Sequence, residues 1–312
     1  MKSAFATIRA QLAPAVLALG IALVIASFAL VVSGHNPFVA YRAMWGNVDG
    51  TNGLVTVVND AAQYYVAALA LAIGFKMNLF NIGANGQFIL GALIGGAVGG
   101  ALRLPAPLHL VITFVAAAAT GSAWAGIAGV LKVTRGVNEV VSTIMLNGIA
   151  LGMSGYLLRV YLKVDDGGQT VHTRTIPKSA RMPNLDRVLR LLGFHLPSGT
   201  SLYGFLLFAV ALGIGFYLLI YRSRFGFDLR ASGINASAAK SSGVDPRRMI
   251  LITMLLSGGV AGVSGMSSLL SKQFEYGDRF PTQLGFTAIG IALLGRNHPG
   301  GIAFAALVYA AI

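Results

Sequence analysis

The apolar stretches of this chain are numerous and long enough to require a membrane. A transmembrane helix needs about 20 mostly apolar residues, and runs near that length recur along the whole sequence. They lie at residues 12–33, 54–75, 86–102, 107–131, 137–161, 200–221, 250–271 and 285–295, with a ninth beginning at Gly301. Only 11% of the 312 residues are charged, whereas soluble domains have roughly 25%. We therefore expect an all-α, polytopic transmembrane helical bundle of about 8 to 10 membrane segments, in one domain over 1–312.

Basic residues indicate how these segments are oriented. Lys2 and Arg9 precede the run 12–33, which is longer than a signal-peptide core and lacks a cleavage site, so we expect an uncleaved first span with a cytoplasmic N-terminus. The short inner connections then hold more Lys and Arg than the short outer ones, as the positive-inside rule requires. The hydrophilic segment 163–199 faces outside as an irregular loop with short helical pieces. Aromatic residues at helical spacing in 35–52 predict a short external interfacial helix.

Composition and motif searches exclude several other functions. The net charge of +13 is dispersed among loops without an aromatic and basic platform, so we attribute it to topology and anionic-lipid contact, not to nucleic acid. There is no cysteine, which excludes disulfides and thiolate chemistry. The five histidines are scattered, and no catalytic motif occurs in a fitting context. A nucleotide-binding loop at Lys240 and Ser241 would need glycine where Ala239 stands. We expect no enzyme, and no metal or cofactor bound by this chain.

One polar, basic segment interrupts the membrane pattern, at 226–248 (GFDLRASGINASAAKSSGVDPRR). Asn235 is suited to cap a short helix, and Gly243 to the left-handed conformation that ends it. Asp245 then caps a second helix with Pro246 in its first position. The result is a small-sided surface helix that suits docking into a groove of another protein. The alternative is an ordinary cytoplasmic loop whose charges set orientation.

Polar residues also lie inside the second expected span. Asn59 and Gln63 are four residues apart and therefore share a helix face. Asp60 would cost about 2.5 to 3.5 kcal/mol at a helix centre without a partner or water. We expect this face to line a pathway. The alternative is that the helix begins later and Asp60 lies among the outer headgroups.

A glycine-rich segment at 78–91 (NLFNIGANGQFILG) places three amides at a bilayer boundary: Asn81, Asn85 and Gln87. Buried amides there need hydrogen-bond partners. The glycines permit a broken or re-entrant segment that lines a polar cavity; the alternative is a tight loop that enters a helix with Asn81 or Asn85 as its cap. Glycines at four-residue spacing predict close helix packing, and they are Gly91, Gly95 and Gly99, Gly148 with Gly152, and Gly258 with Gly262.

The run 137–161 carries a polar stripe of Glu139, Thr143 and Asn147. Either Glu139 contacts a solute, or it marks the cytoplasmic start of the helix, where the helix dipole favours an acid.

Four segments resemble one family, namely FNIGANGQF (80–88), VNEVVSTIMLN (137–147), GINASAAKSSGV (233–244) and GFTAIGIALLGRNHPGG (285–301). They resemble the ribose-permease-like ABC importer permeases, and within these the larger of the two permeases of the nucleoside or simple-sugar branch. The resemblance implies a bacterial inner-membrane importer built from two different permeases, ATPase subunits that bind the ATP, and an extracellular substrate-binding protein. It also implies that a cytoplasmic loop, 222–249, docks on the ATPase through a coupling helix with six matching positions: Gly233, Asn235, Ala238, Ala239, Ser242 and Gly243.

Two departures from the family pattern stand out. Residues 60–65 read DAAQYY where a proline-bearing apolar run is expected, which leaves the identity of the solute open. The family also usually continues past residue 312, so we expect a chain shortened at its C-terminal end.

The leading hypothesis is a permease subunit that passes a nucleoside or related simple sugar, driven by ATP hydrolysis on another subunit. We expect six amides to line its path, because amides both donate to and accept from sugar hydroxyls and base edges: Asn59, Gln63, Asn81, Asn85, Gln87 and Asn147. The rival is an ion-coupled secondary transporter in which Asp60 and Glu139 bind the coupling proton. A purely structural scaffold would need no polar stripes inside its spans.

Overall fold

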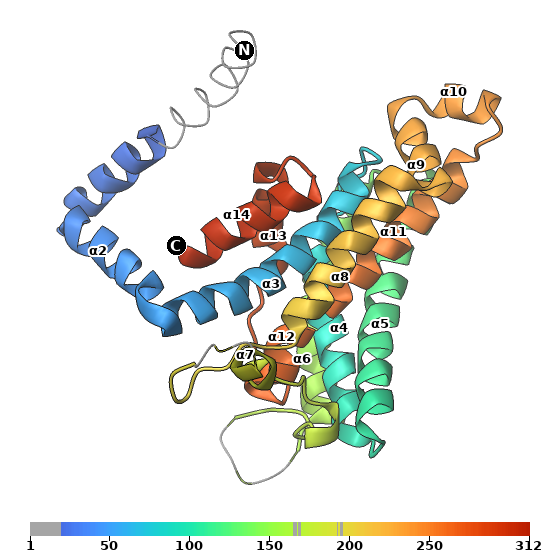
Figure 1. Ribbon diagram of the computed structural model, residues 1–312. Coiled ribbons are helices and arrows are strands. Elements are labelled where there is room, and N and C mark those ends of the chain that lie inside the picture. The colour runs from blue at the N-terminus through green and yellow to red at the C-terminus, as the bar shows by residue number, and fades with distance from the viewer. Residues whose placement is uncertain (1–19, 165–166, 168–169, 192, 194–195) are drawn as a thin grey trace.

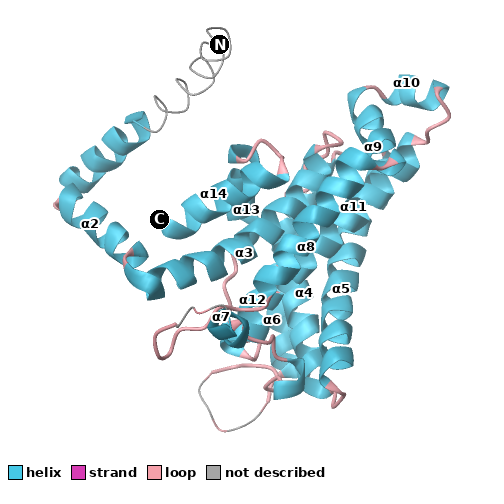
Figure 2. Cartoon of the chain, viewed as in Figure 1, coloured by secondary structure: helices cyan, strands magenta, loops and turns pink. Residues whose placement is uncertain are grey.

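The computed structural model describes residues 20–312 apart from 165–166, 168–169, 192 and 194–195. Across these residues the chain is helical, and its only β-type pairings are two isolated bridges. Figure 2 shows helices joined by short loops, except for one long irregular connection. The main helices are α2 (Pro37–Val48), α3 (Gly50–Phe75), α4 (Ala84–Ala101), α5 (Ala106–Arg135), α6 (Glu139–Leu157), α7 (Asp186–Leu191), α8 (Phe205–Tyr217), α9 (Arg224–Ile234), α10 (Ala236–Ser241), α11 (Pro246–Val263), α12 (Met266–Ser268), α13 (Leu284–Leu294) and α14 (Pro299–Ala311).

Short turns of other helix types extend several of these helices. The π-helical turns η1 (Leu158–Leu162), η3 (Leu218–Arg222) and η4 (Leu269–Gln273) continue α6, α8 and α12, and η2 (Lys178–Ala180) is a 3-10 turn.

Five helical spans within the described residues are long and apolar enough to cross a membrane. They are Gly50–Phe75, Ala106–Arg135, Glu139–Leu162, Phe205–Arg222 and Pro246–Gln273. A sixth would combine Gly20–Val32 with Pro37–Gly46, but these two helices are bent by 116°. The all-α, polytopic fold is thus confirmed. The described residues contain fewer such spans than the 8 to 10 expected, because α4 does not meet these criteria and α13 and α14 are too short to cross alone. The first part of the expected span 12–33 lies outside the described residues.

The helix α4 lies at the centre of the bundle and packs against α5, α6, α11 and α13. Its side chains are almost all buried, and glycines bring neighbouring backbones close. A Cβ atom added to Gly91 would lie 2.6 Å from the Cα of Gly262, and one added to Gly121 would lie 2.2 Å from the carbonyl oxygen of Gly258. Close packing is therefore confirmed at these positions.

Within the described part of this chain, the same expectation is not met at Gly148 and Gly152. No atom of the described chain lies within 4 Å of a Cβ at either position, because both face outward from α6.

Two segments of the chain lie at opposite ends of the bundle. The helices α9 and α10 project at one end, and the long connection around η2 and α7 covers the other (Figure 1). The irregular segment with short helical pieces expected over 163–199 is confirmed in form. It is fastened by backbone hydrogen bonds from Thr173 to Tyr276 (2.8 Å) and from Ile176 to Phe274 (2.7 Å).

The N-terminal arm confirms a helix within 35–52. It is α2, capped by the Asn36 side chain, which accepts a hydrogen bond from Phe38 N. This arm stands away from the bundle, with α14 between them (Figure 1). The helix α3 begins at Gly50, so the later helix start of the alternative interpretation is wrong. The depth of Asp60 in the membrane stays a prediction.

Candidate translocation and coupling site

A tight loop at 76–83 joins α3 to α4. Asn78 adopts a left-handed conformation there (φ 55°), which asparagine tolerates better than most residues. From Ala84 onward α4 is one continuous helix, so the tight-loop alternative describes this segment better than a broken span. The N-cap of α4 is Gly83, without a side-chain hydrogen bond. The expected capping by Asn81 or Asn85 is therefore wrong, and both amides bond elsewhere.

Asn81 and Gln87 form a reciprocal amide pair. Each donates to the side-chain oxygen of the other, at 2.9 and 2.8 Å, and Asn81 also donates to the Ser257 hydroxyl of α11 at 2.8 Å. Asn81 is 0% and Gln87 1% exposed. The desolvation of both amides is thereby offset by hydrogen bonds.

Two further amides join the loop to other helices. Asn147 of α6 accepts from Gly86 N (2.8 Å) and donates to Ile82 O (2.9 Å). Asn85 accepts from Gly285 N of α13 at 3.1 Å. We call Asn81, Asn85, Gln87, Asn147 and Ser257 the buried amide network. Its three separate sets of hydrogen bonds tie the α3–α4 loop and the start of α4 to α6, α11 and α13.

Asn59 and Gln63 lie on the same face of α3 but bond to other partners. The Asn59 amide donates to Ser201 O (2.9 Å) and accepts from Tyr203 N (2.9 Å). Gln63 accepts from the Ser268 hydroxyl at 2.7 Å. In this structure all six amides are bonded to protein groups, so their role in binding a solute stays a prediction.

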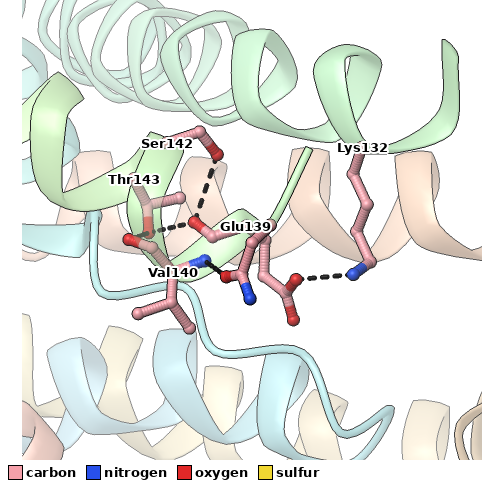
Figure 3. Close-up of polar contacts among 6 residues, drawn as sticks. Lys132, Glu139, Val140, Ser142 and Thr143 are labelled. Carbon is pink, nitrogen blue, oxygen red and sulfur yellow. Dashed lines mark hydrogen bonds and ion pairs between the residues drawn. The ribbon is translucent and has the colours of Figure 1, made fainter. Parts of the chain in front are cut away.

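Both carboxylates of the proton-coupling hypothesis are paired with lysines. Glu139 is the first residue of α6, after the N-cap Asn138, and lies 2.5 Å from the Lys132 ammonium of α5 (Figure 3). Its backbone carbonyl accepts from the hydroxyls of Ser142 and Thr143. This position matches the helix-start interpretation.

Asp60 lies 2.5 Å from the Lys272 ammonium. This ion pair supplies the partner that an acid in a membrane helix requires.

The polar segment at 226–248 forms the caps expected of it. The Asn235 side chain accepts from Ala238 N at 3.0 Å, and the Ser242 hydroxyl donates to Ala238 O at 3.1 Å. Gly243 has a φ of 84°. Asp245 accepts from Arg247 N, with proline following it at the first position of α11. The short helix α10 and its boundaries are thus confirmed.

The outer surface of α9 and α10 has an apolar region, although the segment 226–248 is mostly polar and basic. A cavity of about 420 Å³ lies between them, beside Phe227 and Ile234, which are 63% and 83% exposed. Ala238 is exposed and Ala239 buried. Phe227 and Ile234 were not predicted from the sequence, although two large apolar residues within a basic segment indicate a contact surface.

A direct contact joins α9 to the α3–α4 loop. The Gly233 carbonyl accepts from the Asn78 side chain at 2.8 Å. A Cβ at Gly233 would lie 2.6 to 2.7 Å from backbone atoms of Met77, so only glycine fits this approach. Asn78 was not among the residues predicted from the sequence. Its contact connects the exposed helix α10, through α9, with the loop that carries the buried amide network.

A helical bundle with several membrane-capable helices is the fold of a multi-pass membrane protein. Comparison with known proteins gives the family. The chain belongs to the family described as branched-chain amino acid transport system / permease component, whose model matches residues 53–312.

Three relatives are similar over most of their length. The glucose ABC transporter permease protein TsgB13 of Haloferax volcanii is 35% identical over 298 residues, which cover 93% of this chain and 76% of that protein. The guanosine ABC transporter permease protein NupP of Bacillus subtilis is 34% identical over 282 residues, covering 89% and 77%. A second guanosine ABC transporter permease protein of Bacillus subtilis, NupQ, is 24% identical over 268 residues, covering 82% and 80%. No solved structure matches the chain.

Proposed function

We propose that this chain is the membrane-spanning subunit of a bacterial ABC importer that carries a nucleoside or a related simple sugar. The names of the relatives support the solute class. The observation that carries the mechanism is the contact of Gly233 with the Met77–Asn78 loop, because it joins an exposed helical projection to buried polar groups of the bundle.

In the proposed mechanism, ATP binds to and is hydrolysed on a separate ATPase subunit, and this chain binds no cofactor of its own. The ATPase docks on the coupling helix through Gly233, Asn235, Ala238, Ala239, Ser242 and Gly243. Motion of α10 moves α9, and α9 displaces the α3–α4 loop at Asn78. Since α9 follows α8 and α10 precedes α11, the same motion tilts both flanking helices and opens the path alternately to each side.

The amides are the groups that would meet the solute. When the α3–α4 loop moves, Asn81, Gln87 and Asn147 lose protein partners and offer donors and acceptors to sugar hydroxyls or base edges. Asn85 follows α13, while Asn59 and Gln63 extend the polar face along α3. A solute that makes the same number of hydrogen bonds replaces the lost contacts at little net cost.

The proposed assembly contains a second, different permease. NupP and NupQ, two guanosine permeases of one organism, support a heterodimer. On this chain the outward face of α6 carries three glycines without a neighbour within 4 Å: Gly148, Gly152 and Gly155. Small residues on a membrane helix favour contact with another helix. An extracellular binding protein delivers the solute to the end opposite α10, and the N-terminus lies in the cytoplasm of a cell with this chain in its inner membrane.

A charge on α10 tests the docking role. In Ala238→Glu the carboxylate would have to enter the ATPase groove, so we expect loss of ATPase co-purification and of uptake. The matched control for docking is Val188→Glu, at an exposed position on α7 at the opposite end, which should retain co-purification of the ATPase. Full uptake by Ala238→Glu would show that α10 does not dock there.

Proteoliposomes containing only this chain test the rival. The lysine partners of Asp60 and Glu139 argue against a pair of carboxylates reserved for protons. Solute uptake driven by a proton or sodium gradient, without an ATPase, would overturn the importer proposal.

A further inference from the structure

A second pocket, of about 620 Å³, lies at the end of the bundle opposite α10. It is enclosed by the start of α5, the η2 turn and the residues that follow it, and the end of η4. Its apolar wall includes Pro107, Leu110 and Phe274, and its polar part includes Lys178 and Arg181. No acidic residue lines it, so the pocket carries positive charge next to an apolar surface.

Arg181 is held in a fixed position at this pocket. Its Nε donates to Ile176 O at 3.1 Å, and its guanidinium lies 3.9 Å from the centroid of the Phe274 ring. Guanidinium has five N–H donors, and these contacts use one of them. The terminal N–H groups therefore remain available for an anion in a geometry that suits phosphate oxygens.

Two other donors of the pocket lack partners within the described part of the chain. The Lys178 side chain is exposed and forms no recorded hydrogen bond or ion pair there. The Ser271 hydroxyl is buried and has no hydrogen-bond partner. A buried hydroxyl without a partner costs free energy, which a bound acceptor would recover.

The pocket lies next to the membrane-facing side of α5. The helix α5 presents an exposed apolar face at Leu108, Val111 and Val115, which are 49%, 57% and 59% exposed. In a membrane span such a face contacts acyl chains. The pocket begins on the first turn of this helix, so it lies where the hydrocarbon region ends and headgroups begin.

We infer that this pocket binds the phosphate of an anionic phospholipid headgroup in the leaflet opposite α10. The phosphate lies against Arg181 and Lys178 with Ser271 as a further donor, and the glycerol end lies against Pro107 and Leu110. The inference requires only that the chain spans a membrane, so it stands independently of the transported solute.

The test measures how tightly the purified full-length protein, with any subunits that co-purify, retains phosphatidylglycerol in native mass spectrometry with phosphatidylcholine as the competitor. A basic residue near an anionic lipid surface changes affinity about fivefold. We expect about fivefold weaker retention in Lys178→Gln and about 25-fold in Lys178→Gln with Arg181→Gln. Arg190→Gln, at an exposed position of α7, removes the same charge elsewhere in the external connection and should retain the lipid.

The possible results separate an anionic lipid from free phosphate as the ligand. Arg181 also donates to a backbone carbonyl, so its replacement can affect folding. Lipid retention by the single Lys178→Gln variant does not have this complication. Equal retention of phosphatidylglycerol by the wild type, Lys178→Gln and the double variant would overturn the inference. Competition by millimolar inorganic phosphate, without preference for the lipid, would overturn the lipid assignment and show a free-phosphate site instead.

Discussion

The hydrogen bond from Asn78 to the Gly233 carbonyl makes a quantitative test of coupling possible. Asn78 has a left-handed backbone (φ 55°), in which most side chains cost about 1 to 2 kcal/mol. Alanine would therefore mix strain with loss of the bond. Asn78→Gly removes the bond without strain, because glycine adopts this conformation freely.

The size of the effect follows from the hydrogen bond. A neutral hydrogen bond contributes about 0.5 to 1.5 kcal/mol net, and Asn78 is exposed, so the lower end applies. About 0.5 kcal/mol corresponds to a two- to threefold change in the equilibrium between coupled and uncoupled positions of the loop. We expect the solute carried per ATP hydrolysed to fall about two- to threefold.

The assay is the ratio of uptake to ATP hydrolysis in liposomes that contain the assembled importer. Asn78→Asp is the matched variant, because aspartate tolerates the left-handed conformation but its carboxylate cannot donate to Gly233 O. Both variants should lower the ratio while the thermal unfolding temperature stays near that of the wild type. If both variants fold and keep the wild-type ratio of uptake to ATP hydrolysis, the hydrogen bond between Asn78 and Gly233 does not contribute to coupling.

Three further predictions concern the bundle and its outer end. Asn147→Ala removes the partner of Gly86 N in α4 and of Ile82 O in the α3–α4 loop and should lower stability by about 1 to 3 kcal/mol; an unchanged thermal midpoint in detergent would contradict this. Gly121→Ala places a Cβ against the Gly258 carbonyl and should destabilise the packing of α5 on α11. The control is Gly148→Ala, whose Cβ meets no atom of the described chain within 4 Å. Equal thermal midpoints of the two variants would show that the close contact at Gly121 does not contribute to stability. Burial raises the pKa of Tyr276 from 10.0 to about 12, so the folded state favours the protonated phenol. Its contribution to stability is present below pH 10 and lost as the pH rises to about 12. In ultraviolet titration, Tyr276→Phe should remove one phenol from the late-titrating part of the curve; an unchanged late part would contradict this.

Local features of the structure were predictable from sequence, and non-local ones were not. The caps at Asn235 and Asp245 and the left-handed Gly243 depend on residues within a few positions, so residue type alone identifies them. The helical spans were predictable for the same reason, since hydropathy is read over a window of about 20 residues.

The partners of the buried amides depend on the whole packing. Asn81 bonds to Ser257, 176 positions away, and no local pattern contains that information. Two other expectations have this origin: packing at Gly148, which is not met within this chain, and capping by Asn85, which is wrong. Residue type limits which contacts a position can make, and the packing of the neighbouring helices determines which contact forms.

The enclosure of α4 has a consequence for how this chain can vary. Gly86, Gly91 and Gly99 lie against backbone or short side chains of neighbouring helices, so an added methyl group has no flexible side chain to displace. The outward faces of α5, α6 and α8 have no such limit, because apolar side chains of different size are exchangeable where they are exposed. Substitutions that adapt the chain to new lipids or partners can therefore accumulate on its outer helix faces. At α4 and the positions that contact it, only residues of nearly the same size fit.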